Sequence, residues 1–408
     1  MKIKIKPARS NFNILGQICN LIPTHLVSKI ARDTGVEDQS RTFSPWSHVV
    51  SLTHAQVSHS IGLNDVCDSL QIHGTALASI RGATAPSRNG FSHANRHRPA
   101  QMAEDLFWET LDHLGRQSPG FATGKRRGPA FRFKMPIHLV DSTVLELVAN
   151  CMDWAKHRRR KAAAKTHMRL NLQSLLPSFV IVDTAAEHDN KRARELCADV
   201  KSGEIVIFDK GYLDYGHLLD LHQRGISWVT RAKDNMDYEV IKAMPKSKDE
   251  KILKDEIIAL SNPNKPAPEL MRRIVALVEI DGKEREMTFL TNNLEWSPRS
   301  VADLYRCRWQ IEVFFKQIKQ TLQLGDFLGH NANAVRWQVW IALLVYVLLR
   351  YLSYLSNWPH SFTRLFTILR AVLWQKLNLL GLLGCYGTAK GSFRNLALPE
   401  QAYFAGFV

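Results

Sequence analysis

The segment from Tyr305 to Lys319 carries the residues whose types and spacing are most suggestive of chemistry. Tyr305, Arg308, Glu312 and Lys319 follow one another at intervals of three, four and seven residues. At about 100° of turn per residue, a helix would bring these four side chains within roughly 60° of one another. One carboxylate and three groups that bind phosphate would then share one helix face, which suits chemistry on a phosphodiester.

A plainer interpretation of this segment is a surface helix with an ion pair. Arg308 and Glu312 lie four residues apart, and such pairs stabilise a helix by a few tenths of a kcal/mol. Most charged helix faces are of this kind, so the rest of the chain must decide between the two interpretations. An apolar stripe adjoins the polar one and predicts that the helix packs against a core; it comprises Leu304, Cys307, Ile311, Phe314, Phe315, Ile318 and Leu322.

Two aspartates far upstream could complete a site with Glu312. Asp141 and Asp209 each end a short apolar run, so each is expected at the carboxyl end of a strand. Three such carboxylates would suit hard divalent cations, which prefer oxygen ligands. Two ions together can stabilise the attacking and the leaving oxygen of a displacement at phosphorus. Asp183 ends a similar run, and spacing alone does not choose between Asp141 and Asp183; each could also be an ordinary turn or cap residue.

The elements that would position these acids alternate between strand and helix. Strand-like runs lie at 136–141, 178–183, 204–209 and 226–230. Helical segments at 186–200 and 212–224 alternate with the later runs. This alternation predicts an α/β domain with a mixed central sheet. Acids at the carboxyl ends of its strands would lie where open α/β sheets place their active sites.

The regions on either side of this domain differ from it in pattern. Amphipathic helices are predicted before residue 125, at 14–30, 46–59, 63–70 and 103–114. Residues 232 to about 285 are polar, with strand candidates at 274–280 and 285–291, and indicate an insertion of β character. After residue 325 the chain is predicted to be helical again to about residue 382. The stretch 86–102 is dense in Arg, His, Asn and Ser and suits either DNA contact or an ordinary solvated loop and helix.

Charge points to a polyanionic partner, and nucleic acid is the simplest one. The chain of 408 residues has 54 Lys and Arg against 38 Asp and Glu, a net charge of +16. The basic run at 156–161, with Lys165, His167 and Arg169 beyond it, is expected on the connection after the first strand, where it would contact backbone phosphates. The alternative is a generally basic soluble protein with a solvated basic loop.

The cysteines and one apolar segment indicate the cellular compartment of the protein. The six cysteines are scattered without a CxxC pair, which favours reduced thiols. The N-terminus lacks the apolar core of a signal peptide. The segment 339–355 is apolar but short, and Arg350 interrupts it. It is therefore predicted to be a buried helix of a soluble protein with no membrane partner.

The polar stripe also matches a known signature. Tyr305, Arg308, Glu312 and Lys319 fit the Y-(2)-R-(3)-E-(6)-K pattern of bacterial insertion-sequence transposases of the IS-four family. The sequence HLVDSTVL around Asp141 resembles the first-Asp motif of that family. The sequence IFDKGY around the second Asp resembles its commonly DRGY motif, with Lys in place of Arg. The segments WVTRAK at 228–233 and LTNN at 290–293 also fit, so the resemblance spans about residues 130–350.

This resemblance implies a fold and a set of residue roles. The expected fold is an RNase H-like catalytic core at 130–325 with a β-rich insertion at about 232–290, between a helical DNA-binding region at 1–125 and a helical region at 326–408. Asp141, Asp209 and Glu312 become catalytic metal ligands, and the family order of motifs favours Asp141 over Asp183. The expected DNA contacts are Tyr305, Arg308, Lys319, Arg158, Arg159, Arg160 and Lys161.

The resemblance also implies an activity. The chain is expected to be a DNA transposase that cleaves insertion-sequence ends with Mg²⁺ or Mn²⁺, using two ions, and joins them to target DNA by cut-and-paste transposition. Its partners would be the terminal inverted repeats and target DNA, bound by a homodimer in the bacterial cytoplasm at the nucleoid. The alternatives are an RNase H-like nuclease without strand transfer and an inactive or domesticated DNA-binding protein.

Overall fold

The structure is a computed structural model that forms two compact units. It describes residues 7–36, 43–124, 132–147, 156–158, 161–184, 189–262, 266–280, 282–322, 324 and 327–387. The first unit consists of Met1–Ala122, Leu145–Ala163 and Phe315–Val408, and the second of Thr123–Val144 and Ala164–Phe314.

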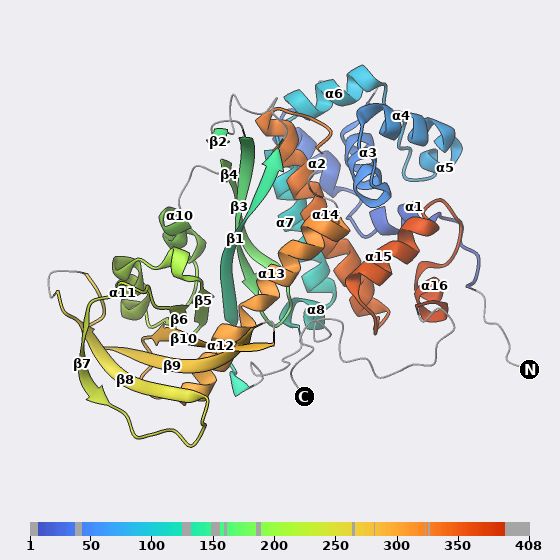
Figure 1. The fold of residues 1–408 in the computed structure, drawn as a ribbon. Coiled ribbons are helices and arrows are strands. Elements are labelled where there is room, and N and C mark those ends of the chain that lie inside the picture. The colour runs from blue at the N-terminus through green and yellow to red at the C-terminus, as the bar shows by residue number, and fades with distance from the viewer. Residues whose placement is uncertain are drawn as a thin grey trace, which may run out of the picture. The chain divides into compact units, whose positions relative to one another are not determined.

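The first unit is largely helical, as its sequence pattern predicts (Figure 1). Its helices are α1 (Ile14–Cys19), α2 (Leu26–Asp33), α3 (Pro45–Ser58), α4 (Leu63–Ile72), α5 (Gly74–Ala78), α6 (Arg88–His97), α7 (Gln101–Gln117), α8 (Pro119–Thr123), α14 (Ala332–Leu355), α15 (Phe362–Ala371) and α16 (Leu379–Cys385). Helix α3 begins one residue before its predicted start at 46, because Ser44 accepts a hydrogen bond from the amide of Ser47 and Pro45 occupies the first turn. The single helix predicted at 14–30 is wrong, since two helices flank Pro23, whose missing N–H disfavours a continuous helix.

Helix α14 contains the long apolar segment. It is long and apolar enough to cross a membrane by length and composition, but 78% of that window is buried within the structure. It packs against α3, α6, α7 and α15. This burial is typical of the core helix of a soluble protein, as the sequence predicts.

Two histidines of α3, His48 and His54, are buried in the first unit. His48 bonds through Nε2 to Oδ1 of Asn95 at 2.8 Å and packs against the Trp337 ring. Burial lowers the pKa of His48 to about 3 and that of His54 to about 4.

We expect the free energy of unfolding to fall as the pH drops below about 6.5. Below that pH the histidines of the unfolded chain bind protons, whereas the buried histidines of the folded chain stay neutral because their pKa is lowered. This difference lowers the free energy of unfolding by about 2 kcal/mol for each histidine by about pH 5. Denaturant titrations at the two ends of this range would measure the change. His48→Gln and His54→Gln should each reduce the difference by about that amount. An unchanged pH dependence in both variants would contradict the assignment.

The second unit holds most of a ten-stranded mixed sheet. The strands are β1 (Ile137–Leu147), β2 (Lys156–Arg158), β3 (Lys161–Asn171), β4 (Pro177–Thr184), β5 (Ile205–Phe208), β6 (Ser227–Arg231), β7 (Tyr238–Ala243), β8 (Ile252–Leu260), β9 (Met271–Ile280) and β10 (Lys283–Thr291). The order is β2-β3-β1-β5-β6-β10-β9-β8-β7, with β4 paired to β3. Strand β5 runs parallel to β1 and β6. The four predicted strand runs are confirmed as β1, β4, β5 and β6. The prediction that Asp141 ends its strand is wrong, because β1 continues beyond it to Leu147.

The basic segment after β1 differs from its prediction as a connection. Residues 156–158 form β2 and residues 161–171 form β3, which pairs antiparallel with β4. Arg169 is buried and bonds Asp199 through two nitrogens, at 2.5 and 2.8 Å. His167 is fully buried. Arg169 and His167 are therefore structural residues, and their prediction as phosphate contacts is wrong.

Strands β7 to β10 occupy the region predicted to have β character. The predicted strands at 274–280 and 285–291 are confirmed as β9 and β10, and Gly282 takes a φ of 71° between them. Strand β8 begins at Ile252, inside the polar stretch of this region, where no strand is predicted from the sequence. The end of β10, Phe289–Thr291, pairs with β6, so this region is continuous with the central sheet.

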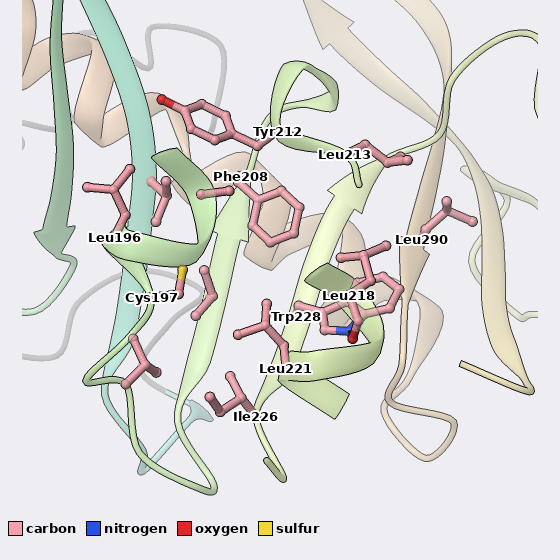
Figure 2. Close-up of a cluster of buried hydrophobic side chains, with 14 of the residues drawn as sticks. Leu196, Cys197, Phe208, Tyr212, Leu213, Leu218, Leu221, Ile226, Trp228 and Leu290 are labelled. Atoms are coloured by element: carbon pink, nitrogen blue, oxygen red, sulfur yellow. The ribbon is translucent and has the colours of Figure 1, made fainter. Parts of the chain in front are cut away.

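Helices pack on this sheet and bury its centre. Helices α10 (Asp189–Leu196) and α11 (Tyr215–Gln223) form a buried apolar cluster with β5 and β6, in which Leu196, Leu218, Phe208 and Trp228 lie close together (Figure 2). Helix α12 (Pro298–Cys307) packs against β5, β6, β8, β9 and β10. All four residues of β5 are buried, as expected for a parallel strand at the centre of a sheet.

Candidate active site

Asp141 and Asp209 lie side by side because of the register between two parallel strands. Val140 of β1 pairs with Phe208, the last residue of β5, and each is followed by an aspartate: Asp141 within β1 and Asp209 just beyond β5. Neighbouring strands lie about 4.8 Å apart. The structure thus brings together two acids that are far apart in the sequence, at the carboxyl end of β5.

Glu312 is carried by a helical segment that packs against the same sheet. Helix α12 begins where Ser297 accepts a hydrogen bond from the amide of Ser300. Helix α13 (Trp309–Lys316) continues it after a break at Arg308, and the π-helical turn η5 (Gln317–Thr321) follows. The single regular helix predicted for this segment is therefore wrong in detail. Its predicted apolar stripe is confirmed, since all seven side chains are buried: Leu304, Cys307, Ile311, Phe314, Phe315, Ile318 and Leu322.

Two side chains of the signature connect the three acids. The hydroxyl of Tyr305 donates to Oδ1 of Asp209 at 2.8 Å. Nη1 of Arg308 donates to Oδ2 of Asp141 at 2.9 Å, and its Nη2 donates to Oε1 of Glu312. The ion pair between Arg308 and Glu312 therefore exists, but Arg308 also reaches a strand 167 residues away. A surface helix pair does not account for that second contact.

The cluster is partly buried, and this burial makes its charges interact strongly. The exposed fraction of the side chain is 16% for Arg308, 18% for Asp141 and 33% for Glu312. Burial, with the nearby charges of Glu312 and Asp209, raises the pKa of Asp141 to about 6, although Arg308 opposes the shift. Burial also raises the pKa of the Tyr305 hydroxyl, which keeps it a donor.

Arg308 stays charged at this site. Burial works to lower the pKa of Arg308, but Tyr305, Asp141 and Glu312 outweigh it and raise that pKa above its ordinary value. A guanidinium presents several N–H donors in a planar fork, which suits two carboxylates at once. Arg308 is therefore a permanent positive charge placed between two acids.

The donor set of this cluster fits a divalent cation. Carboxylate oxygens are the ligands that hard divalent cations prefer. One cationic group already contacts both Asp141 and Glu312, so the two carboxylates are able to share one positive charge. Among the residues that the structure describes, no three His, Cys, Asp or Glu side chains converge closely enough to hold a metal ion. The guanidinium of Arg308 occupies the space between the two carboxylates instead.

Asp183, the rival of Asp141, has a different environment. It lies in β4, which pairs with β3, and β3 separates β4 from β1 in the sheet. Its carboxylate accepts a hydrogen bond from Arg192 of α10. Asp183 therefore has a structural partner of its own.

The other predicted DNA contacts lie outside α12 and α13. Lys319 lies in η5 of the first unit, where burial lowers the pKa of its amine against the opposing charge of Glu146. Arg158 lies in β2 and Lys161 begins β3. Arg159 and Arg160 lie outside the described residues.

The structure adds Arg231 to the residues whose charge acts on Tyr305. Arg231 ends β6, and its charge acts on the Tyr305 hydroxyl. Lys233 lies two residues further on, and its Nζ donates to the carbonyl oxygen of Leu213 at 3.2 Å. Both residues belong to the WVTRAK segment at 228–233, which resembles a segment of the family. That resemblance alone assigns no role to either residue, because their positions depend on where β6 lies in the sheet.

Comparisons with known proteins agree with one another. Residues 132–348 match the model of the transposase DDE domain, and residues 10–80 match a domain of unknown function (DUF4372). A Sinorhizobium fredii protein whose name assigns it to the transposases (y4zB) is 30% identical over 67% of this chain and 73% of its own length. A Geobacillus stearothermophilus protein assigned as the transposase of insertion sequence element IS5377 is 25% identical over 81% of this chain and 82% of its own.

Two further matches are more distant. The transposase InsG for insertion sequence element IS4 of Escherichia coli is 25% identical over 45% of this chain and 42% of its own length. Among solved structures, the piggyBac transposase synaptic complex with hairpin DNA covers 90% of this chain and 82% of that chain. Its TM-score of 0.46 and identity of 11% are too low to support conclusions about this chain.

Proposed function

Because the chain belongs to the family of transposases with a DDE domain, we propose that Asp141, Asp209 and Glu312 are its catalytic metal ligands. The protein is a DNA transposase of the bacterial insertion-sequence type, and its activity depends on a divalent metal. Proteins of this family catalyse DNA cleavage and strand transfer. We propose which residues of this chain carry out cleavage and strand transfer, and which contacts position them.

One observation carries the proposed ligand set. Arg308 bonds both Asp141 of β1 and Glu312 of α13, and Tyr305 of the same helical segment bonds Asp209 at the end of β5. Two adjoining strands and a packed helix are rigid supports, and rigid supports favour a preorganised site. A surface ion pair would not require acids from three separate elements.

We propose that the sheet around these acids is an RNase H-like core. In support, the strands β4-β3-β1-β5-β6 form a block in which antiparallel pairing of β4 with β3 gives way to parallel pairing at β1, β5 and β6. The catalytic domain would span residues 130–325 with the β-rich insertion at about 232–290. Helical regions at 1–125 and 326–408 would flank it, and the first of them would bind DNA.

Helix α6 is the proposed DNA-contacting element of the N-terminal region. Its exposed side chains include Arg88, Arg96 and His97, and its buried side includes Phe91 and Asn95. The basic face is thus turned to solvent, and cationic side chains on such a face suit backbone phosphates.

The proposed mechanism assigns separate tasks to the acids and the cationic groups. When bound, Mg²⁺ or Mn²⁺, as two ions, would activate the attacking group and stabilise charge on the leaving oxygen. Asp141, Asp209 and Glu312 would hold those ions, while Tyr305, Arg308 and Lys319 orient the phosphate backbone. Water would first release a 3′ hydroxyl at the transposon end. That hydroxyl would attack the opposite strand, which frees the element as a hairpin end, and water would open the hairpin and regenerate the 3′ hydroxyl. This hydroxyl would then attack target DNA in cut-and-paste transposition. A homodimer would bind the terminal inverted repeats and the target in the bacterial cytoplasm, at the nucleoid.

Incubation of the protein with DNA that carries the ends of its own insertion sequence tests this function. We expect cleavage at the ends with Mg²⁺ or Mn²⁺, joining to a target plasmid, and neither reaction with EDTA. Cleavage without joining of pre-cleaved 3′ hydroxyl ends would indicate the nuclease alternative. Binding without cleavage in either metal would indicate the DNA-binding alternative.

Asp183→Asn provides a matched test of the choice between the two aspartates. Because Asp183 pairs with Arg192 and lies on β4, we expect this variant to cleave the transposon ends within a few-fold of the wild-type rate, since structural ion pairs contribute little to chemistry. Cleavage rates of Asp183→Asn and Asp141→Asn should be compared in one assay. If Asp183→Asn is inactive although folded, and Asp141→Asn remains active, the assignment is reversed.

A further inference from the structure

Arg308 occupies a position that its proposed contact with DNA phosphate does not explain. Its two terminal nitrogens are engaged by Asp141 and Glu312, and its side chain is largely buried. These are two of the three proposed metal ligands. The guanidinium therefore occupies oxygens of two of the carboxylates that would hold a divalent cation.

Electrostatics explains why a cation is needed there before any metal arrives. Asp141 and Glu312 each bond a terminal nitrogen of the same guanidinium, so these two carboxylates lie close together. Like charges in a partly buried site repel, and an opposite charge between them relieves the repulsion. A guanidinium fork satisfies two carboxylates while it fixes their separation and direction.

We propose that Arg308 is a positioning residue that holds Asp141 and Glu312 in place until a divalent cation displaces its guanidinium, which then becomes free to bind a DNA phosphate. This inference rests on the proposed ligand set. The guanidinium of Arg308 cannot bond the two carboxylates and a DNA phosphate at the same time. Metal and DNA binding are therefore coupled, because each favours the state in which Arg308 has left the carboxylates.

Tyr305 differs from Arg308 in this scheme. Its uncharged hydroxyl donates a hydrogen bond to Oδ1 of Asp209 and leaves the other oxygen of that carboxylate to a further partner. It brings no charge that competes with a metal ion. The displacement is therefore confined to Arg308.

Binding of Mn²⁺ to the DNA-free protein, followed by electron paramagnetic resonance, tests the displacement. Arg308→Met keeps much of the side-chain volume and removes the competing charge. We expect it to bind Mn²⁺ on the order of tenfold more tightly than wild type, a size usual for coupled sites. Arg231→Met removes a nearby charge that does not bridge these carboxylates, and should change the affinity much less. Equal effects of the two variants, or no effect of Arg308→Met, would overturn the proposal.

The coupling gives a second readout that a merely structural role would not alter. In the wild type, Mn²⁺ should tighten binding of a pre-cleaved transposon end, and in Arg308→Met this enhancement should largely disappear. An enhancement of wild-type size in Arg308→Met would contradict the proposal. If Arg308→Met does not fold, Arg308→Gln removes the charge while keeping a donor, and the same results are expected.

Glu312→Gln separates this inference from the function on which it depends. If Glu312→Gln leaves Mn²⁺ affinity unchanged, the proposed ligand set is wrong. If Glu312→Gln weakens Mn²⁺ binding and Arg308→Met does not strengthen it, the ligand set stands and only the positioning role of Arg308 is wrong.

Discussion

Glu312→Gln is expected to slow cleavage at the transposon ends by about 10³-fold or more, because the lost ligand removes charge stabilisation worth several kcal/mol in the transition state. The amide keeps the size of the side chain and an oxygen that accepts from Arg308. Glu312 is one-third exposed at the rim of the cluster, so the substitution should leave the fold intact. Single-turnover cleavage of a labelled end would measure the effect.

Binding of the same DNA is the control for this variant. Because the proposed phosphate contacts come from Tyr305, Arg308 and Lys319, Glu312→Gln should bind a transposon end within a few-fold of wild type, or more tightly through lost repulsion. Cleavage at the wild-type rate would remove Glu312 from the catalytic residues. Loss of binding together with cleavage would show that Glu312 acts on DNA affinity rather than on chemistry.

Arg272→Met is expected to destabilise the second unit by about 3–5 kcal/mol, because it leaves Asp255 buried without its partner. Arg272 of β9 bonds both carboxylate oxygens of Asp255 of β8, at 2.7 and 2.6 Å, and both side chains are buried. Arg272 also donates to the carbonyl oxygens of Leu294 and Trp296, just before α12 begins. The pair thus ties the β-rich region to the segment that leads to the helix of the site.

Two control variants test whether the lost stability comes from the unpaired carboxylate of Asp255. Arg285→Met, on the exposed part of β10, should change the free energy of unfolding by no more than about 0.5 kcal/mol. The double variant Arg272→Met with Asp255→Leu should recover part of the loss, since an apolar pair avoids the unpaired charge. Arg272→Met with wild-type stability in denaturant unfolding would show that the β-rich region is not bound to α12 in this way.

The sequence predicts the parts of the fold that have strong local patterns. The short apolar runs that precede Asp141 and Asp209 form part of β1 and all of β5, and their register, with Val140 opposite Phe208, explains why the two acids meet. Strand β3 escapes prediction because KAAAKTHMRLN has neither β-branched enrichment nor clean alternation. Its strand form comes from pairing with β4 and from the buried contact of Arg169 with Asp199. Tertiary contacts of this kind are not visible in a local pattern.

The candidate site is predictable in composition but not in its contacts. The spacing from Tyr305 to Glu312 indicates which side chains share a face, and the three acids follow from the motifs. That Tyr305 bonds Asp209, and that Arg308 bonds Asp141, depends on how α12 packs across the sheet. The sequence therefore predicts phosphate contacts for these residues, whereas the structure adds a role toward the acids.

The account depends most on the claim that Asp141, Asp209 and Glu312 together bind the catalytic cation. Mn²⁺ affinity in the complex with a pre-cleaved transposon end tests this claim, with wild type compared with Asp141→Asn, Asp209→Asn and Glu312→Gln. We predict that each of the three weakens Mn²⁺ binding on the order of tenfold or more, as loss of a charged oxygen ligand implies, while Asp183→Asn does not. Wild-type Mn²⁺ affinity in any of the three variants would contradict the account.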